Sequence, residues 1–297
     1  MSEKNANLVD KRATGLLIIE VRNSNPNGDP DRESDPRQRQ DGRGEISPVS
    51  FKRKLRDLIE DKQCPVWIDI KTKKNLVENR FYILEQRGRK REDIKKELAN
   101  GGEVFKDKYW DGRLFGNTFL EEGGSTTIKT GVVQFGLGVS MSPVDIERLT
   151  NTSKSGVEEG KDRGMAPLAY RIVKHGVYCI PFFVNPTAAQ KTGCVQEDID
   201  VMLHLIPYAY PHTASYIRPY VEIRHAWYME HKSALGSCSD FALIDALTPK
   251  RKGETDERRK ENTEKPSTSW DDYDVPKELP KELRERLNNF KDLMNEQ

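Results

Sequence analysis

The chain has 297 residues and a formal net charge of only +1 at pH 7, because 49 Lys and Arg nearly balance 48 Asp and Glu. This length suits one large domain or two small ones. The near-cancellation excludes nucleic-acid binding through a global charge excess, so any such binding requires local segregation of charge.

The four cysteines are widely spaced and contain no CxxC pair, which argues against a zinc ribbon or a disulfide framework and predicts reduced structural thiols. No stretch reaches the roughly 18 apolar residues that cross a bilayer. The polar start "MSEKNANLVDKR" lacks the apolar region of a signal peptide. We therefore expect a cytoplasmic protein.

The first half of the chain predicts a strand and a helix. Residues 14–21 form a continuous apolar run, typical of a strand that is covered on both faces. After a loop rich in Asn, Pro and Gly, residues 48–60 predict a helix that Ser47 caps, and its apolar stripe consists of Phe51, Leu55, Leu58 and Ile59. Residues 62–128 read as an inserted subdomain, with a strand-like aromatic piece, "RFYILEQ", and a helical piece, "REDIKKEL".

The second half predicts three more strands and a helix. The stretch "GVVQFGLGVSM" alternates, with Val133, Phe135, Leu137 and Val139 on one face and Gln134, Gly136 and Gly138 on the other. Residues 150–166 are polar and predict a long excursion, and a strand follows at 170–184. The next elements are a helix with Val195, Ile199, Leu203 and Ile206 on one stripe and a strand at 220–228.

Without its insertions, the order is strand, helix, strand, strand, helix, strand. This order indicates an α+β protein of the ferredoxin-like class, the split βαβ arrangement that RNA-recognition domains also use. Beyond residue 248 we expect a flexible charged linker and then a short terminal helix within "ELPKELRERLNNFKDLMNE".

The helix at 48–60 carries a basic face, because Lys52 and Arg56 are four residues apart, with Arg53 and Lys54 to either side. A row of phosphates could follow such a face. On its own, however, the pattern more often marks a solvated helix surface.

The loop "NSNPNGDP" offers amide donors and acceptors at Asn23, Asn25 and Asn27, near a helix start that favours anions. Gly136 and Gly138 would leave a bare strip that a ligand backbone could approach, although each glycine equally fits a bulge or tight packing. Together these features favour a nucleic-acid surface. Because no base-stacking aromatic motif of RNA-recognition domains is present, we expect recognition of backbone and shape.

A catalytic alternative rests on the loop carboxylates of Asp29, Asp31 and Asp35, which could hold a divalent ion. Asp beside Pro and Gly is more often turn chemistry. No HExxH, GxxxxGK[ST], GxSxG or GxGxxG motif is present, so the sequence predicts no metal or cofactor. A ferredoxin-like scaffold that binds no nucleic acid is a third alternative.

Several motifs occur in a characteristic order: "NPNGDP" after the first strand, "FKRKLRD" in the first helix, "GRLFG" before "TGVVQFGLG", and "NPTAAQKTG" before "EDID". Over residues 14–235 they resemble the backbone subunit, of the Cas-seven family, of type I CRISPR Cascade complexes, with the type I-B and I-C branch closest. Two stretches depart from the branch pattern, the arginine-rich "DRESDPRQRQDGRGEI" and "MAPLAYRIVKHG".

The resemblance implies a hand-shaped subunit. Its ferredoxin-like palm would comprise residues 1–61, the strand region 129–141 and residues 170–248, with a helical finger insertion at 62–128 and a thumb hairpin at 142–169. Residues 249–297 would form the charged linker and tail. We place no counterpart for this tail in the family pattern, and it could contact a neighbouring subunit or an additional effector.

The resemblance also implies a function in antiviral defence, without catalysis. Several copies would polymerise along a guide RNA (crRNA) for recognition of target DNA. Partners would include the repeat-handle-binding subunit, the large subunit and a helicase-nuclease or other effector. Met141 or Met165 could be an apolar wedge at a displaced base, or simply core. The complete set of predicted RNA-binding residues is Asn23, Asn25, Asn27, Ser47, Lys52, Arg53, Arg56, Arg113, Gln134, Gly136, Gly138, Ser140, Met141, Arg163 and Met165.

Overall fold

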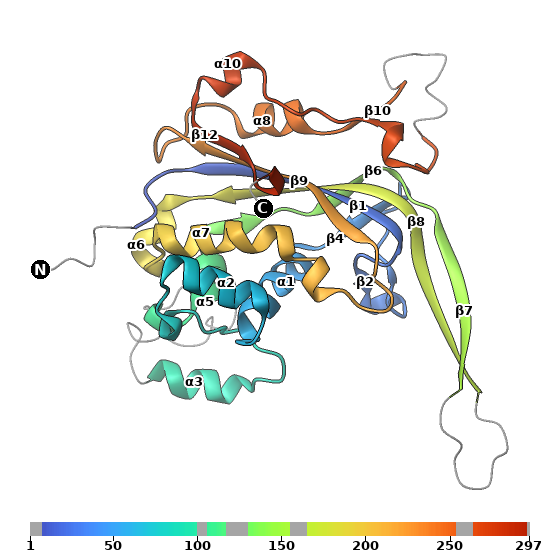
Figure 1. The fold of residues 1–297 in the computed structure, drawn as a ribbon, viewed down its shortest axis with the longest axis horizontal. Coiled ribbons are helices and arrows are strands. Elements are labelled where there is room, and N and C mark those ends of the chain that lie inside the picture. The colour runs from blue at the N-terminus through green and yellow to red at the C-terminus, as the bar shows by residue number, and fades with distance from the viewer. Residues whose placement is uncertain (1–7, 100–105, 117–129, 155–164, 254–263, 296–297) are drawn as a thin grey trace, which may run out of the picture.

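A computed structural model describes residues 8–99, 106–116, 130–154, 165–253 and 264–295. The chain is an α+β protein built on a large antiparallel sheet, in which the main strand order is β12-β9-β1-β8-β6-β4 (Figure 1). These strands are β1 (Ala13–Ser24), β4 (Arg43–Ile46), β6 (Gly138–Pro143), β8 (Met165–Val184), β9 (Val221–His231) and β12 (Leu287–Asp292).

Strand β1 is covered on both faces, as its continuous apolar run predicted. Leu17 and Ile19 belong to the core cluster under the helices, whereas Leu16 and Ile18 belong to a second cluster formed with the C-terminal segment. The predicted strand at 14–21 is therefore confirmed, and the observed strand continues to Ser24.

Helices cover one face of the sheet (Figure 1). The predicted first helix is confirmed as α1 (Pro48–Glu60): the Ser47 hydroxyl caps it by accepting from the Ser50 N–H, and all four residues of its apolar stripe are buried. The second predicted helix is confirmed as α7 (Gln196–Leu205), which follows the short helix α6 (Ala189–Thr192).

The insertion at 62–128 contains α2 (Pro65–Lys74), α3 (Arg91–Ala99) and α5 (Trp110–Phe115). The prediction of a strand in "RFYILEQ" was wrong. Phe81, Ile83 and Leu84 are all buried. Side chains at odd and even positions therefore both fill space between helices, and the alternation of a strand is lost. Trp67 and Trp110 join the same core as α1, so this segment packs on the main core, and Leu84, Ile94 and Tyr109 form a small cluster within the insertion itself.

The stretch 133–143 is not one alternating strand. It divides into β5 (Val133–Phe135) and β6, both of which pair with β8. The break at Gly136 and Leu137 changes which side is buried, so Leu137 is 41% exposed although the sequence placed it with Val133. A one-residue irregularity therefore inverted the predicted faces beyond Gly136.

A two-stranded hairpin extends beyond the sheet (Figure 1). It consists of β7 (Ile146–Lys154) and the first part of β8, in register from Ile146 opposite Val173 to Lys154 opposite Met165. The predicted long strand thus begins at 165 rather than 170, inside the segment that the sequence read as an excursion. Residues 155–164 lie outside the described residues.

The C-terminal segment covers the second face of the sheet with α8 (Asp240–Leu247), β10 (Lys250–Arg251), β11 (Tyr273–Asp274) and α10 (Lys281–Arg284), and its last strand, β12, joins the sheet beside β9. Leu243, Leu247 and Leu287 pack in the cluster that contains Leu16 and Ile18. The predicted short terminal helix is confirmed as α10, which has four residues. The sequence did not predict the strand that follows, β12, which forms because the edge of β9 offers backbone partners. The middle of the predicted linker, 254–263, lies outside the described residues.

All four cysteines are free, in agreement with the predicted reduced thiols. Within the described residues, no helix is long and apolar enough to cross a membrane.

Candidate nucleic-acid interface

The loop after β1 is held in place by its own asparagines. Asn25 and Asn27 are buried, whereas Asn23 is exposed and has a left-handed backbone with φ of 41°. The Asn25 amide donates to the Ser34 carbonyl at 2.7 Å, and the Asn27 oxygen accepts from the Ser47 N–H at 2.7 Å. Of the three predicted contacts, only Asn23 therefore lies on the surface.

Ser47 has two structural tasks. Its backbone N–H is bound by Asn27, and its hydroxyl accepts from the Ser50 N–H at 3.2 Å to cap α1. The loop and the helix start are consequently one hydrogen-bonded unit.

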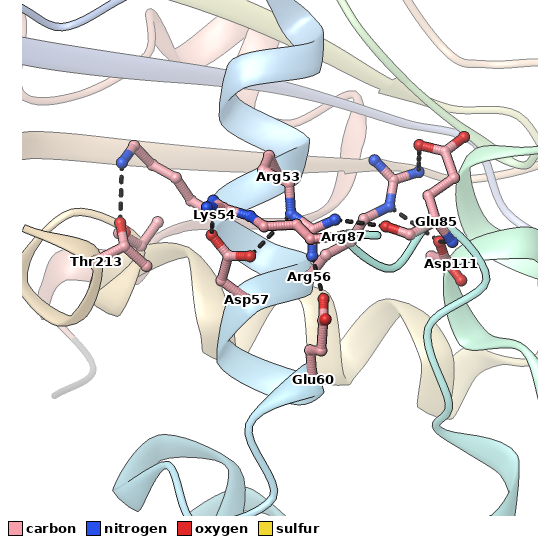
Figure 2. A network of polar contacts seen from close by, with 10 residues as sticks. Arg53, Lys54, Arg56, Asp57, Glu60, Glu85, Arg87, Asp111 and Thr213 are labelled. Atoms are coloured by element: carbon pink, nitrogen blue, oxygen red, sulfur yellow. Dashed lines mark hydrogen bonds and ion pairs between the residues drawn. The ribbon is translucent and has the colours of Figure 1, made fainter. Parts of the chain in front are cut away.

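The outer face of α1 is neutralised by carboxylates (Figure 2). Arg53 pairs with Asp57 at 2.8 Å and with Glu60, and it also donates to the Glu85 carbonyl. The sequence predicted a row of free cations on this helix. For Arg53 this prediction was wrong, because its guanidinium is paired with acids that lie one turn and two turns later on the same helix.

Arg56 is buried rather than on a solvent-facing row. It is 2% exposed and pairs with Asp111 at 2.9 Å and with Glu85 at 3.0 Å (Figure 2). Asp111 also accepts from the Leu84 N–H at 2.7 Å. Arg56 therefore joins α1 to the insertion, and in this arrangement it presents no guanidinium to a phosphate.

Two lysines of α1 form no ion pair with the carboxylates that the structure describes. Lys52 lies over the Phe115 ring, and burial lowers the pKa of its amine. Lys54 is 4% exposed, lies over the Tyr210 ring and donates to the Thr213 hydroxyl at 2.9 Å (Figure 2). The uncompensated positive charge of α1 is thus on Lys52 and Lys54.

Lys54 lines a cavity of about 730 Å³ beside α1. The segment 212–215, Arg53, Arg87 and Arg218 also line it, as do the carboxylates of Asp57, Glu60 and Asp61. Arg218 donates to the Asn25 carbonyl at 2.7 Å and forms no ion pair with any described residue. Burial and the nearby Arg218 lower the pKa of Lys54 to about 7. Arg53 pairs with Asp57 and Glu60, and Arg87 pairs with Asp57, so Lys54 and Arg218 are the cations of this cavity that pair with no described carboxylate. An anionic ligand would relieve both the burial of these two charges and their repulsion.

A second cavity of about 270 Å³ lies at the base of the hairpin. It is lined by Arg148 of β7, by Tyr170 and Arg171 of β8, and by Asn25 and Asp35 of the first loop. Arg171 pairs with Asp35, so hairpin and loop are joined here.

The glycine strip is packed, not bare. A methyl group on Gly136 would lie 2.8 Å from the Pro181 side chain, and one on Gly138 would lie 2.6 Å from the Ile180 side chain. The prediction of an open approach for a ligand backbone was therefore wrong, because β8 occupies the space. Gln134 is exposed, whereas Ser140 is buried and its hydroxyl accepts from the Gly44 N–H at 2.9 Å.

The remaining predicted contacts are dispersed. Arg113 is 1% exposed and makes a bidentate pair with Asp198, at 3.0 and 2.7 Å. Met141 packs at the edge of the second core cluster. Met165 begins β8 opposite Lys154, and Arg163 lies outside the described residues.

The loop aspartates act as turn and pairing residues. The Asp29 carboxylate accepts from the Asp31 N–H at 3.2 Å, in the short hairpin of β2 (Gly28–Asp29) and β3 (Asp35–Pro36), and Asp35 pairs with Arg171. Among the described residues, no group of three or more His, Cys, Asp or Glu side chains could hold a metal ion.

Sequence reasoning missed Arg218, Arg148 and Arg171. Each is an isolated cation in a loop or a hairpin, without the i, i+4 spacing that singled out α1. The sequence placed Lys54 on the basic face of this helix but left it out of the predicted RNA contacts, because the spacing rule favoured Lys52 and Arg56.

Comparisons with known proteins agree on one family. A sequence model of the family "CRISPR-associated protein Cas7" matches residues 11–278. The CRISPR-associated protein Cas7 of Haloferax volcanii is 25% identical over 209 residues, which are 64% of this chain and 61% of the relative, so the chain matches less than two thirds of that relative's length.

Solved structures give weaker similarities. A chain of a CRISPR RNA-guided surveillance complex in a pre-nicking state has a TM-score of 0.47 and 16% identity, with 73% of this chain and 77% of that chain covered. A chain of the type III-B Cmr-beta complex bound to cognate target RNA has a TM-score of 0.40 and 13% identity, with coverage of 73% and 60%.

The buried pair of Arg113 and Asp198 generates a stability prediction. Arg113→Met leaves an uncompensated buried carboxylate and is expected to lower the free energy of unfolding in urea by about 3–5 kcal/mol. The matched control is Lys74→Met, which breaks the partly exposed pair of Lys74 with Asp200 and should cost no more than about 1 kcal/mol. Unchanged stability of Arg113→Met together with weaker RNA binding would instead place Arg113 in the interface.

Proposed function

We propose, because this chain belongs to the family of CRISPR-associated protein Cas7, that it is a non-catalytic subunit that binds a guide RNA and repeats along it as the backbone of a CRISPR surveillance complex. The observation that carries this proposal is the pair of uncompensated cations, Lys54 and Arg218, in one cavity beside α1. A phosphodiester is the anion that suits two such cations in a family of RNA-guided complexes.

The strand order supports a ferredoxin-like palm as the finer description of the fold. Strands β9, β1, β8 and β6 lie in that order, with α1 before β6 and α7 before β9 in the chain, as the split βαβ arrangement requires. We assign the insertion at 62–128 to the finger and the hairpin of β7 and β8 to the thumb.

The proposal extends to the assembly. We expect a type I complex in the cytoplasm, in which several copies of this chain bind one guide and recognise target DNA with the repeat-handle-binding subunit, the large subunit and a recruited helicase-nuclease. Phosphate contacts carry no sequence information, so binding should tolerate any guide.

Charge removal in the cavity tests the proposal. The double variant Lys54→Gln with Arg218→Gln should weaken binding of unrelated single-stranded RNAs to a similar degree. It should also reduce the slope of log K against log salt by about 1.4, since each phosphate contact on a single strand contributes about 0.7. Fluorescence anisotropy over a salt series measures both quantities.

Arg53→Gln is the matched control, because it removes a charge of the same helix that Asp57 and Glu60 already neutralise. We expect its salt slope to equal that of the unaltered protein. An unchanged slope in the double variant would contradict the assignment of phosphates to this cavity.

The low pKa of Lys54 gives a pH dependence with a defined sign. Because Lys54 loses its proton as pH rises through about 7, RNA affinity should fall above this pH, by no more than about tenfold per unit for one proton. A bound phosphate raises the pKa of Lys54 and so moves the fall in RNA affinity to higher pH. In Lys54→Arg the charge persists, so RNA affinity should change less with pH. Arg218, Asp57 and His212 of the same cavity are present in both proteins, so a difference between the two pH profiles reports on Lys54. Parallel profiles would refute a role for the Lys54 charge.

The absence of catalysis is tested separately. The assembled complex, incubated with labelled complementary RNA and Mg²⁺, should leave the RNA intact. Cleavage at regular intervals that disappears in Asp29→Ala or Asp31→Ala would establish the ribonuclease alternative instead.

A further inference from the structure

The turn at 213–218 separates the two cation-lined cavities. Thr213, Ser215 and Arg218 line the larger cavity, whereas Ile217 lines the smaller one. We call residues 213–218 the ridge. It is fastened to the first loop on its inner side, since the Asn25 N–H donates to the Ile217 carbonyl at 2.8 Å and Arg218 donates to the Asn25 carbonyl.

The ridge presents an aromatic ring. The Arg218 N–H donates to the Ser215 carbonyl at 2.8 Å, which closes a turn with Tyr216 as one of its two central residues. Tyr216 is 61% exposed, although a large apolar ring is costly to leave in water. Its ring lies edge-on to Tyr170 of β8, with 5.4 Å between centroids and an interplanar angle of 67°. The hairpin therefore buttresses the ring and leaves most of its surface accessible.

The charges on both sides of the ridge indicate what this ring could bind. Lys54 and Arg218 lie in the larger cavity. The smaller cavity is lined by Arg148, which forms no ion pair with a carboxylate that the structure describes, by the paired Arg171 and Asp35, and by Glu33. Single-stranded nucleic acid has the matching pattern, a flat base between two phosphates, and aromatic rings beside cationic grooves are its common binding surface. An acidic peptide could pair with the cations but has no base to stack on the Tyr216 ring.

We propose that Tyr216 is a stacking platform for one unpaired base of the bound RNA, whose flanking phosphates enter the two cavities. This inference rests on the proposed function and adds to it a base contact that no motif of the sequence indicated. The contact is independent of sequence, because every base has a face that can stack.

Substitution of Tyr216 tests the inference. Tyr216→Ala should weaken single-stranded RNA binding by about 5- to 150-fold with an unchanged salt slope, because a stacking contact releases no counterions. Tyr216→Phe keeps the ring and should bind as the unaltered protein does. Binding of duplex RNA should not respond to Tyr216→Ala, because the faces of paired bases are covered by their neighbours.

Tyr220→Ala is the matched control. Tyr220 lies in the same connection and is 66% exposed, but it is outside the turn that Ser215 and Arg218 close. Its loss should change RNA affinity by less than about twofold, and thermal melting of all variants checks the fold. The inference is overturned if Tyr216→Ala binds normally, if Tyr220→Ala loses as much, or if the duplex is equally affected. If the inference fails in one of these ways but the unaltered protein binds RNA in a salt-dependent manner, the proposed function still holds. If the unaltered protein binds no RNA, both the inference and the proposed function are wrong.

Discussion

The geometry of the interface depends on the hydrogen bonds that Asn25 and Asn27 make inside the first loop. Asn27 holds the backbone of Ser47 and thereby the start of α1, whereas Asn25 holds the ridge through its backbone N–H and carbonyl. Lys54 and Arg218 come from segments that are far apart in the chain, and this loop brings them to one cavity. The loop is therefore a support for cations on its neighbours rather than a row of direct contacts.

Local pairing decides which cations remain for a ligand. The chain carries almost equal numbers of positive and negative residues. Arg53, Arg56 and Arg113 are each held by one or two acids, and for Arg56 and Arg113 the pairing is required because an unpaired buried charge costs several kcal/mol. Lys54 is buried without an acid, at the expense of a lowered pKa. This difference distinguishes a structural cation from a candidate ligand contact better than position on the helix does.

The sequence predicted the elements whose apolar pattern is long and regular. Strand β1 and helices α1 and α7 were correct, because burial on one or both faces dictates their composition. The errors arose where tertiary partners override the local pattern: Phe81 and Ile83 fill space between helices, and the terminal segment pairs with β9. The glycine strip failed for the same reason, since the residues that fill it belong to β8, about 40 positions later in the chain.

The candidate site was predictable only in part. The motif order located the first loop and α1, but spacing alone could not show that Asp111 is buried against Arg56, nor that an isolated Arg218 reaches the same cavity as Lys54. Such information lies in contacts between distant segments. Exposure of Tyr216 is likewise a property of the turn that Ser215 and Arg218 close.

The edges of the sheet constrain how copies of this chain could associate. One edge ends in β4, which has four residues and an irregular register with β6, and the other ends in β12, whose register with β9 also shifts. Short and irregular edges are poor templates for strand addition. The C-terminal segment, in turn, covers the second face of the sheet with Leu243 and Leu247. Copies of this chain that bind along one guide RNA, as proposed, would then be held together by contacts between side chains and by the shared RNA rather than by a continuous sheet. This fits an assembly whose length is set by its guide.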